Sequence, residues 1–272
     1  MIDINCKKEE ASRWFRSLRD KFCQAFEKID QKGNFERKKW SHSGAGGGEM
    51  SIMKGEIFEK VGVNISTVSG VFSEDYRKQV KGTENSPEYW ASGISLVAHM
   101  TSPKIPAFHF NTRLLVTEDF WFGGGADMTP TFENKNDTEI FHRRMKESCD
   151  LTDKNYYKEF KKNCDEYFYL PHREEARGAG GIFFDHLNTN DWEKDFNFIK
   201  EVGNKTFEAI SEIVNLHKNK EWNNEEKDKQ LIKRVRYVEF NLIWDRGTLF
   251  GLKTGGSTEA ILMSMPPSAK WK

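Results

Sequence analysis

The sequence predicts an α+β fold with a largely antiparallel sheet. Several segments alternate between apolar and polar residues with a period of two, which is typical of strands, and turn residues join neighbouring segments as hairpins. Amphipathic helical patterns flank these strands instead of alternating with them one by one, which disfavours a parallel βαβ arrangement. The chain has 272 residues, enough for one sizeable core, and we expect one domain over residues 1–272.

The segment 107–116 carries the clearest strand pattern. Its apolar side consists of Phe108, Phe110, Leu114 and Val116. The other side carries His109, Asn111 and Arg113, whereas a strand that faces bulk water usually carries Lys, Glu, Thr or Ser. From His109 to Arg113 this side spans roughly 13 Å at about 3.3 Å per residue. The pattern therefore predicts one wall of a polar cavity, long enough for a large polar ligand.

The first half of the chain contributes a helix and strands. An amphipathic helix is predicted over 8–30, and a Gly-rich segment at 44–48 precedes short strands that end at Val71. Residues 94–99 alternate again. Two prolines break the chain over 101–106, and if this break closes a hairpin, His99 and His109 lie nearly opposite each other.

The second half is predicted to be mainly helical. Helices are expected from Asp153 to Tyr169, from Asp191 onward and over about 224–234. Alternation over 237–244 predicts a further strand, and 245–248 are expected to form its hairpin turn. A short helix is expected to start at Thr258 and end at Pro266.

Composition excludes several classes of protein. Lys plus Arg equals Asp plus Glu at 42 each, so the chain lacks the basic excess of a general nucleic-acid binder. No run of 18 apolar residues and no cleavage signal are present in the sequence, so we expect a soluble, cytoplasmic protein with no membrane span. The four cysteines form no close pair or trio, which disfavours a zinc knuckle or an iron–sulfur cluster.

Two groups of residues suggest chemistry. His99, His109, His142 and His172 could bind a divalent metal, although their spacing matches no metal motif and each could instead be a hydrogen-bonding histidine. Arginines are typical partners of carboxylates and phosphates, and Arg113 lies on the polar strand face. Arg173 and Arg177 either bind an anion or pair with the neighbouring Glu174 and Glu175. The amides of Gly255, Gly256 and Ser257 precede a helix and are a candidate anion site.

The glycine-rich segments do not bind nucleotides. WFGGGADMTP, at 121–130, ends its glycine run next to Asp127, but it lacks both the GxGxxG spacing and the Walker lysine. GAGGG and GAGG fail the same test. The sequence therefore predicts no organic cofactor.

Several long motifs resemble one known family. GISLVAHMTSPKIPAFHFNTR, WFGGGADMTP, CDEYFYLPHREEARGAGGIFFDHLN and RYVEFNLIWDRGTLFGLKTGGSTEAILMSMPP are similar to those of oxygen-dependent coproporphyrinogen III oxidase. The resemblance implies a large antiparallel sheet between layers of helices, assembled as a homodimer. It implies oxidative decarboxylation of the ring A and B propionates of coproporphyrinogen III to vinyl groups, which yields protoporphyrinogen IX, carbon dioxide and hydrogen peroxide. Molecular oxygen is the co-substrate, no organic cofactor is used, and a divalent metal is ascribed to some members.

The resemblance also implies site residues. His109 resembles the proton donor, and Asp127 an acid that acts on the pyrrole. Ser95, Asn111, Thr112 and Arg113 resemble substrate contacts, as do Gly255, Gly256 and Ser257, although the family has arginine where Ser257 stands. The four histidines His99, His109, His142 and His172 resemble the metal ligands. Residues from about 238 to 272 resemble the dimerisation segment.

Two other functions stay open at this point. One is a non-catalytic tetrapyrrole-binding protein that uses the same polar face. The other is a metal-dependent oxygenase built on the histidines. The radical enzyme that performs the same conversion without oxygen is disfavoured, because its cluster needs a close cysteine trio.

Overall fold

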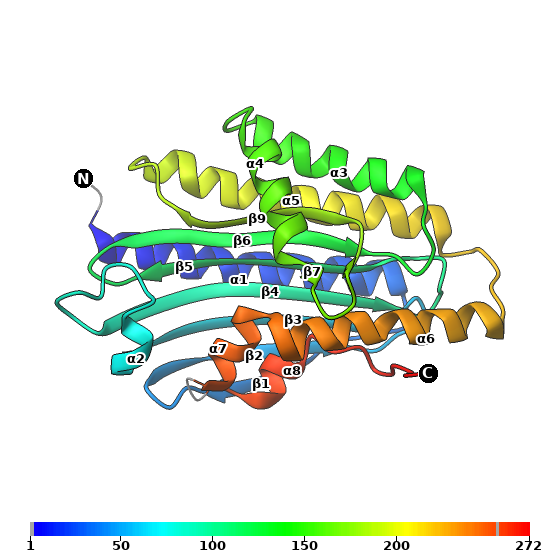
Figure 1. The fold of residues 1–272 in the computed structure, drawn as a ribbon, viewed down its shortest axis with the longest axis horizontal. Helices are drawn as coiled ribbons and strands as arrows, with labels where there is room; N and C mark the ends of the chain where they lie inside the picture. The colour runs from blue at the N-terminus through cyan, green and yellow to red at the C-terminus, as the bar shows by residue number, and fades with distance from the viewer. Residues whose placement is uncertain (1–2, 254–255) are drawn as a thin grey trace.

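A seven-stranded antiparallel sheet forms the centre of the molecule (Figure 1). The computed structural model describes residues 3–253 and 256–272. The strand order is β1-β2-β3-β4-β5-β6-β9. The strands are β1 (Glu36–Ser41), β2 (Ala45–Met53), β3 (Phe58–Val71), β4 (Glu88–Met100), β5 (Ala107–Val116), β6 (Phe120–Thr129) and β9 (Gly180–Leu187). The predicted α+β fold with an antiparallel sheet is confirmed.

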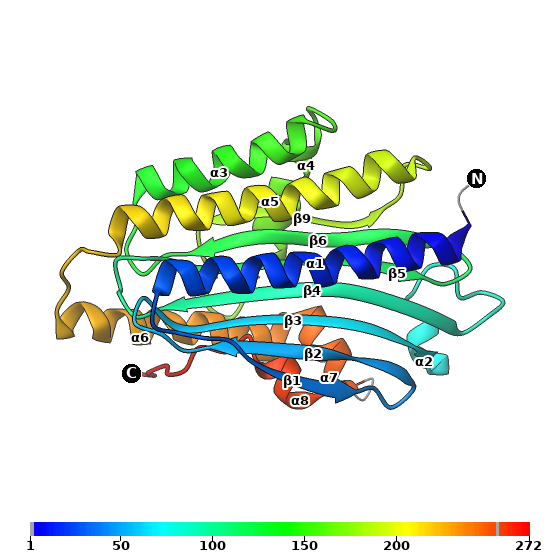
Figure 2. The same ribbon diagram turned by 180° about the vertical axis from the view of Figure 1, so that it is seen from behind.

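Helices cover both faces of the sheet. On one face lie α1 (Ile4–Asp30) and α5 (Trp192–His217), with α3 (Lys135–Asp150) alongside α5 (Figure 2). The opposite face is covered by α6 (Asn224–Glu239), the π-helical segment η1 (Phe240–Trp244), α7 (Arg246–Lys253) and α8 (Thr258–Leu262) (Figure 1). The remaining elements are α2 (Glu74–Arg77), α4 (Tyr156–Tyr167) and the small hairpin β7 (Tyr169–Leu170) and β8 (Glu175–Ala176).

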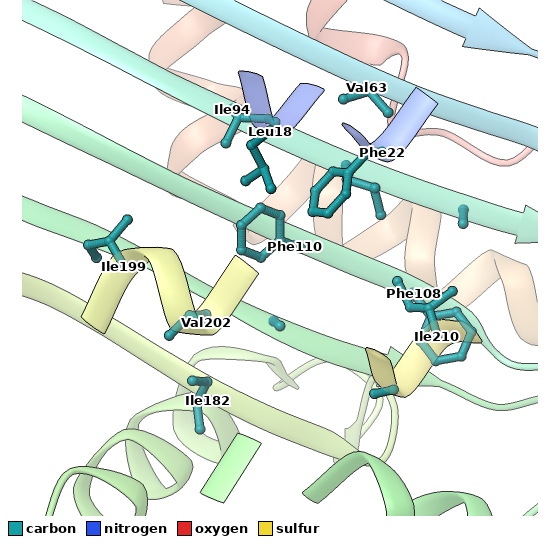
Figure 3. Close-up of a cluster of buried hydrophobic side chains, with 14 of the residues drawn as sticks. Leu18, Phe22, Val63, Ile94, Phe108, Phe110, Ile182, Ile199, Val202 and Ile210 are labelled. Carbon is teal, nitrogen blue, oxygen red and sulfur yellow. The ribbon is translucent and has the colours of Figure 1, made fainter. Parts of the chain in front are cut away.

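The hydrophobic core fills the space between the sheet and the α1/α5 layer (Figure 3). Phe22 of α1 meets Phe110 of β5 edge to face, with ring centroids 5.7 Å apart. Phe122 of β6 stacks on Phe196 of α5 at 5.8 Å. Side-chain caps fix where both helices begin, since Asp3 accepts the Asn5 N–H and Asp191 accepts the Lys194 N–H. Since one face of the sheet is apolar and sealed, the polar side chains of β4, β5 and β6 must face the other layer.

The predicted strand over 237–244 is wrong. A capping box of Asn223 and Glu226 starts α6, which runs to Glu239 and continues as η1. The turn predicted at 245–248 is also wrong, because Asp245 accepts the Thr248 N–H at 3.0 Å and caps α7. The alternation that suggested a strand has another origin. Phe240 is buried against Tyr167 and Phe168, while Leu242 and Trp244 are exposed.

Two smaller expectations need correction, and one helix was not predicted. The helix predicted from Asp153 starts at Tyr156, and Asp153 instead accepts the Asn155 N–H in the preceding turn. The helix α3 was not predicted from the sequence. The β4–β5 hairpin forms, but Val97 lies opposite His109, so His99 and His109 are diagonal neighbours.

Candidate active site

One face of β4, β5 and β6 brings together the predicted site residues Ser95, His109, Asn111, Arg113 and Asp127. Asn111 lies opposite Ser95 of β4, and His109 lies opposite Asp127 of β6. Because side chains alternate along a strand, His109, Asn111 and Arg113 share this face. Thr112 does not: it is 1% exposed and points into the opposite, apolar layer. The expectation that its side chain contacts the substrate is therefore not supported by its position.

His109 is held by hydrogen bonds on both ring nitrogens. Its Nδ1 lies 2.8 Å from Oδ1 of Asp127, and its Nε2 lies 3.1 Å from Nδ2 of Asn111. A carboxylate only accepts, so the proton of the neutral ring is on Nδ1, and Nε2 accepts from the Asn111 amide. Asp127 and Asn111 together fix both the tautomer and the direction of the His109 ring. A carboxylate does the same for the catalytic histidine of a Ser-His-Asp triad.

The second oxygen of Asp127 is bound by Arg177. This guanidinium is 1% exposed, donates through NH2 to Asp127 Oδ2, and donates through NH1 to Oδ1 of Asn241 at 3.1 Å. Three rings surround it, those of Phe168, Tyr237 and Phe240, at 4.1, 4.6 and 4.7 Å from its carbon. Paired charge and aromatic faces together make this deep burial of a cation tolerable.

Burial alone would raise the pKa of Asp127, but the Arg177 guanidinium and His109 outweigh it and hold that pKa below its usual value. Asp127 is therefore ionised at neutral pH. It is also 2% exposed with both oxygens occupied. Direct contact with a pyrrole, as the resemblance implied, would require one of these hydrogen bonds to break. The group that borders the polar face is His109.

Arg113 meets a carboxylate of the protein itself. Its NH2 donates to Oδ1 of Asp185 on β9 at 3.0 Å, and both side chains are partly exposed. Gly123 lies beside this pair, and a Cβ there would come within 2.8 Å of both groups. A larger residue at this position would therefore push the ion pair apart.

The predicted anion site near Ser257 is only partly present. The Gly256 N–H donates to the Gly251 carbonyl at 3.0 Å, so this amide is already used. The Ser257 hydroxyl accepts the Ala260 N–H and caps α8. No residue among those that the structure describes accepts the hydrogen of this hydroxyl. Gly255 lies outside the described residues.

The four histidines do not converge on one metal site. His99 is buried, donates from Nε2 to the Ser264 carbonyl, and has its pKa lowered to about 3 by burial. His142 is bonded to the Ala179 carbonyl and the Tyr157 hydroxyl. His172 is bonded to Glu239 and Trp244. Over residues 3–253 and 256–272, no three His, Cys, Asp or Glu side chains are grouped as metal ligands. These residues do not fit a shared divalent metal.

The partners of several residues near the site were not predicted from the sequence. Arg177 was a candidate, but its partner is Asp127 and not Glu174 or Glu175, while Arg173 pairs with Glu239. The contact of Asn241 with Arg177 was not foreseen, because the strand predicted over 237–244 does not form. Asp185 had a usable signal, because it follows the buried Ile182 and Phe184 in a period-two pattern that puts it on the polar face.

The fold and this face together are those of an enzyme built on an antiparallel sheet, with an oriented histidine and an arginine side by side on one strand. Residues 10–272 match the family model described as Coproporphyrinogen III oxidase, and the chain belongs to this family. The chain is 53% identical to the oxygen-dependent coproporphyrinogen-III oxidases of Rickettsia bellii (strain OSU 85-389) and Rickettsia akari (strain Hartford). The corresponding protein of Rickettsia conorii (strain ATCC VR-613 / Malish 7) is 52% identical. Each alignment covers 97% of this chain and 98% of the relative.

The family expected from the motifs is thus confirmed. Among the described helices, none combines the length and the apolar character needed to cross a bilayer.

Proposed function

We propose that this chain is an oxygen-dependent oxidase that converts coproporphyrinogen III to protoporphyrinogen IX in haem biosynthesis. In each reacting propionate arm, the β-carbon loses a hydrogen with its electron pair, and the carboxylate leaves as carbon dioxide. Dioxygen takes that hydrogen and electron pair together with one further proton and becomes hydrogen peroxide. The arm that remains is a vinyl group. The observation that carries the proposal is the Asp127-oriented His109 on the same face as Arg113, in a chain of this family.

Arg113 is the proposed anchor for a substrate carboxylate. The substrate carries four propionates, and burying an unpaired carboxylate is costly. A charge-assisted hydrogen bond contributes roughly 1.5–3 kcal/mol, so Arg113 and a few polar neighbours suffice to fix the orientation. Ser95 and Asn111 flank it on the same face. Ser257 is a further proposed contact through its hydroxyl, together with Gly255 and Gly256.

His109 is the proposed proton-transfer group. Neutral His109 accepts the pyrrole N–H proton on Nε2, in place of the hydrogen bond from the Asn111 amide, as the electron-rich ring reacts with dioxygen. It then gives this proton to the peroxide, and the pyrrole nitrogen regains a proton from solvent when carbon dioxide leaves. The ionised Asp127 stabilises the imidazolium formed in between. Asp127 is therefore a positioning residue that acts through His109. Arg177 in turn keeps Asp127 ionised and in place.

A homodimer and a cytoplasmic location complete the proposal. Four large apolar side chains of η1 and α7, Leu242, Ile243, Trp244 and Leu252, are between 41% and 48% exposed. A cluster of this kind is typical of a protein interface. It lies within the segment 238–272, which we propose as the dimer contact.

An aerobic assay that follows carbon dioxide and porphyrin products from coproporphyrinogen III tests the proposal. We expect carbon dioxide release in air and none without oxygen. Binding without carbon dioxide release would instead favour a tetrapyrrole carrier. Activity that a chelator removes and one metal restores would favour the histidine-based oxygenase.

A further inference from the structure

A hollow lies on the side of the sheet that carries His109, at the end where β3 stops and β4 begins. It encloses about 620 Å³. We name it the distal pocket, and its walls come from the β1–β2 turn, the end of β3, α2, the start of β4 and the end of α7. In Figures 1 and 2, α2 lies beyond α7 at this end of the sheet.

The inner wall of the distal pocket is aromatic. Phe72 stacks on Tyr89 with centroids 4.3 Å apart and an angle of 18° between the rings. Tyr76 lies 5.5 Å from Phe72 and 5.1 Å from Phe250 of α7. Tyr89 and Phe72 are buried, so the wall is fixed by packing. It offers flat apolar surface with phenol hydroxyls at its edges, as ligand pockets for ring compounds usually do.

The charge on the pocket wall favours an anion. Lys253 lines the pocket from α7, and within residues 3–253 and 256–272 no carboxylate forms an ion pair with it. The carboxylate that shares the wall, Asp75, is 100% exposed and lies 3.9 Å from Lys78, so water screens it. His42 adds an imidazole whose Nδ1 accepts the Gly44 N–H at 3.1 Å.

The distal pocket continues the face that carries His109. Gly93 lies opposite Arg113, and Tyr89 lies opposite Gly70. These two rows are four residues apart along β4, or roughly 13 Å, and the same alternation places them on one face. Tyr76 of α2 packs on Phe72 and Phe250 in the pocket. Burial and the nearby Asp185 raise the pKa of Tyr76, while the nearby Arg113 and Arg246 lower it. Tyr76 therefore borders both the distal pocket and the ion pair of Arg113 with Asp185.

We propose that the distal pocket binds a carboxyethyl arm of the tetrapyrrole that does not react, with Lys253 as its cationic anchor. This assignment rests on the proposed function, because it needs a substrate with carboxylates on opposite sides of a macrocycle. Arg113 then holds the arm nearer to His109, and Lys253 holds one farther away. Two anchors on opposite sides prevent the macrocycle from turning within the site.

Binding of oxidised coproporphyrin III, a four-carboxylate analogue that cannot react, tests the distal pocket. Its fluorescence is titrated against the full chain and against Lys253→Gln, Lys253→Arg and Lys220→Gln. Lys220 is an exposed lysine in the α5–α6 connection and serves as the matched control. We expect Lys253→Gln to weaken binding about tenfold, which corresponds to ~1.4 kcal/mol. Lys253→Arg should bind nearly as the parent, and Lys220→Gln should bind as the parent.

A second variant tests the cavity itself. Ser43→Trp places a large ring in the distal pocket from an exposed turn position, where the fold can accept it, and it should weaken binding at least as much. Unchanged affinity in both Lys253→Gln and Ser43→Trp would overturn the assignment. If Arg113→Ala still weakens binding in that case, the proposed function stands without a distal anchor. If coproporphyrin III binds to no form and no carbon dioxide is released from coproporphyrinogen III, the proposed function fails first.

Discussion

Arg113 and Asp185 form an ion pair across β5 and β9, with NH2 and Oδ1 3.0 Å apart on the polar face of the sheet. A substrate carboxylate that binds Arg113 must compete with this internal carboxylate. In the proposed function, Asp185 therefore holds the Arg113 guanidinium until a substrate carboxylate replaces it. It also spares Arg113 from facing the pocket unpaired.

Asp185→Asn removes the competitor and keeps the shape of the side chain. We therefore expect a lower KM with little change in kcat. Steady-state kinetics in air measure both. A raised KM would show instead that Asp185 orients Arg113 for the substrate.

Arg113→Ala should raise KM by roughly ten- to a hundredfold, the loss of about 1.5–3 kcal/mol of charge-assisted binding, with a smaller effect on kcat. Arg143→Ala is the matched control, because Arg143 pairs with Glu212 on the far helical layer. A normal KM in Arg113→Ala would place the carboxylate anchor elsewhere.

Asp127→Asn should lower kcat about a hundredfold or more, in the range of a lost general acid–base group, and leave KM nearly unchanged. The amide no longer fixes the His109 tautomer. It also leaves Arg177 buried without a counter-charge, so we expect a loss of ~3–5 kcal/mol in the free energy of unfolding.

The double variant Asp127→Asn with Arg177→Met separates these two effects. Removing both charges should recover much of the stability but not kcat, as urea unfolding and kinetics on the same samples will show. Recovered turnover in the double variant would mean that Asp127 only stabilises the fold.

Glu239 should make stability depend on acid pH. The Arg173 guanidinium lowers the pKa of Glu239 from 4.5 to about 2. Hydrogen bonds from His172 and Trp271 act in the same direction, and partial burial opposes them. A carboxylate whose pKa is lower in the folded state than in the unfolded state stabilises the fold fully at pH values above its unfolded-state pKa. That contribution is lost as pH falls from about 4.5 toward 2.

Urea unfolding between pH 6 and pH 3 measures this slope. Glu239→Gln should flatten it, and Glu221→Gln, at an exposed site, should not. An identical slope in the parent and Glu239→Gln would show that the interactions of Glu239 do not persist in solution.

Ile243→Glu should dissociate the proposed homodimer, because it places a charge in the centre of the exposed apolar cluster of η1 and α7. Sedimentation velocity over a range of concentrations reports the oligomeric state. Leu151→Glu is the control, since Leu151 is also apolar and exposed but lies just after α3. A dimer that survives Ile243→Glu would move the contact to another surface.

His142→Gln should leave turnover unchanged, because His142 binds the Ala179 carbonyl and the Tyr157 hydroxyl away from the polar face. His109→Gln should abolish proton transfer and with it most of kcat. The same loss in both variants, restored by one added metal, would contradict the separation of the histidines and favour a shared metal site.

The sequence alone determined the faces of individual elements. Alternation along 107–116 placed His109 and Arg113 together and Phe108 and Phe110 in the core. The apolar stripe of α1 and the start of α5 near Asp191 were equally visible, because these signals come from residues close together in the chain. The motifs also identified the family.

Only the tertiary structure decided which charges meet. Asp127 pairs with Arg177, 50 residues away in the sequence, and Arg113 pairs with Asp185, 72 residues away. Both pairs therefore depend on strand order and register. The same limit explains the error at 237–244. A period-two pattern also fits a helix whose apolar residues divide between a buried side and an exposed one, and only packing against the sheet shows that Phe240 is inside while Leu242 is outside.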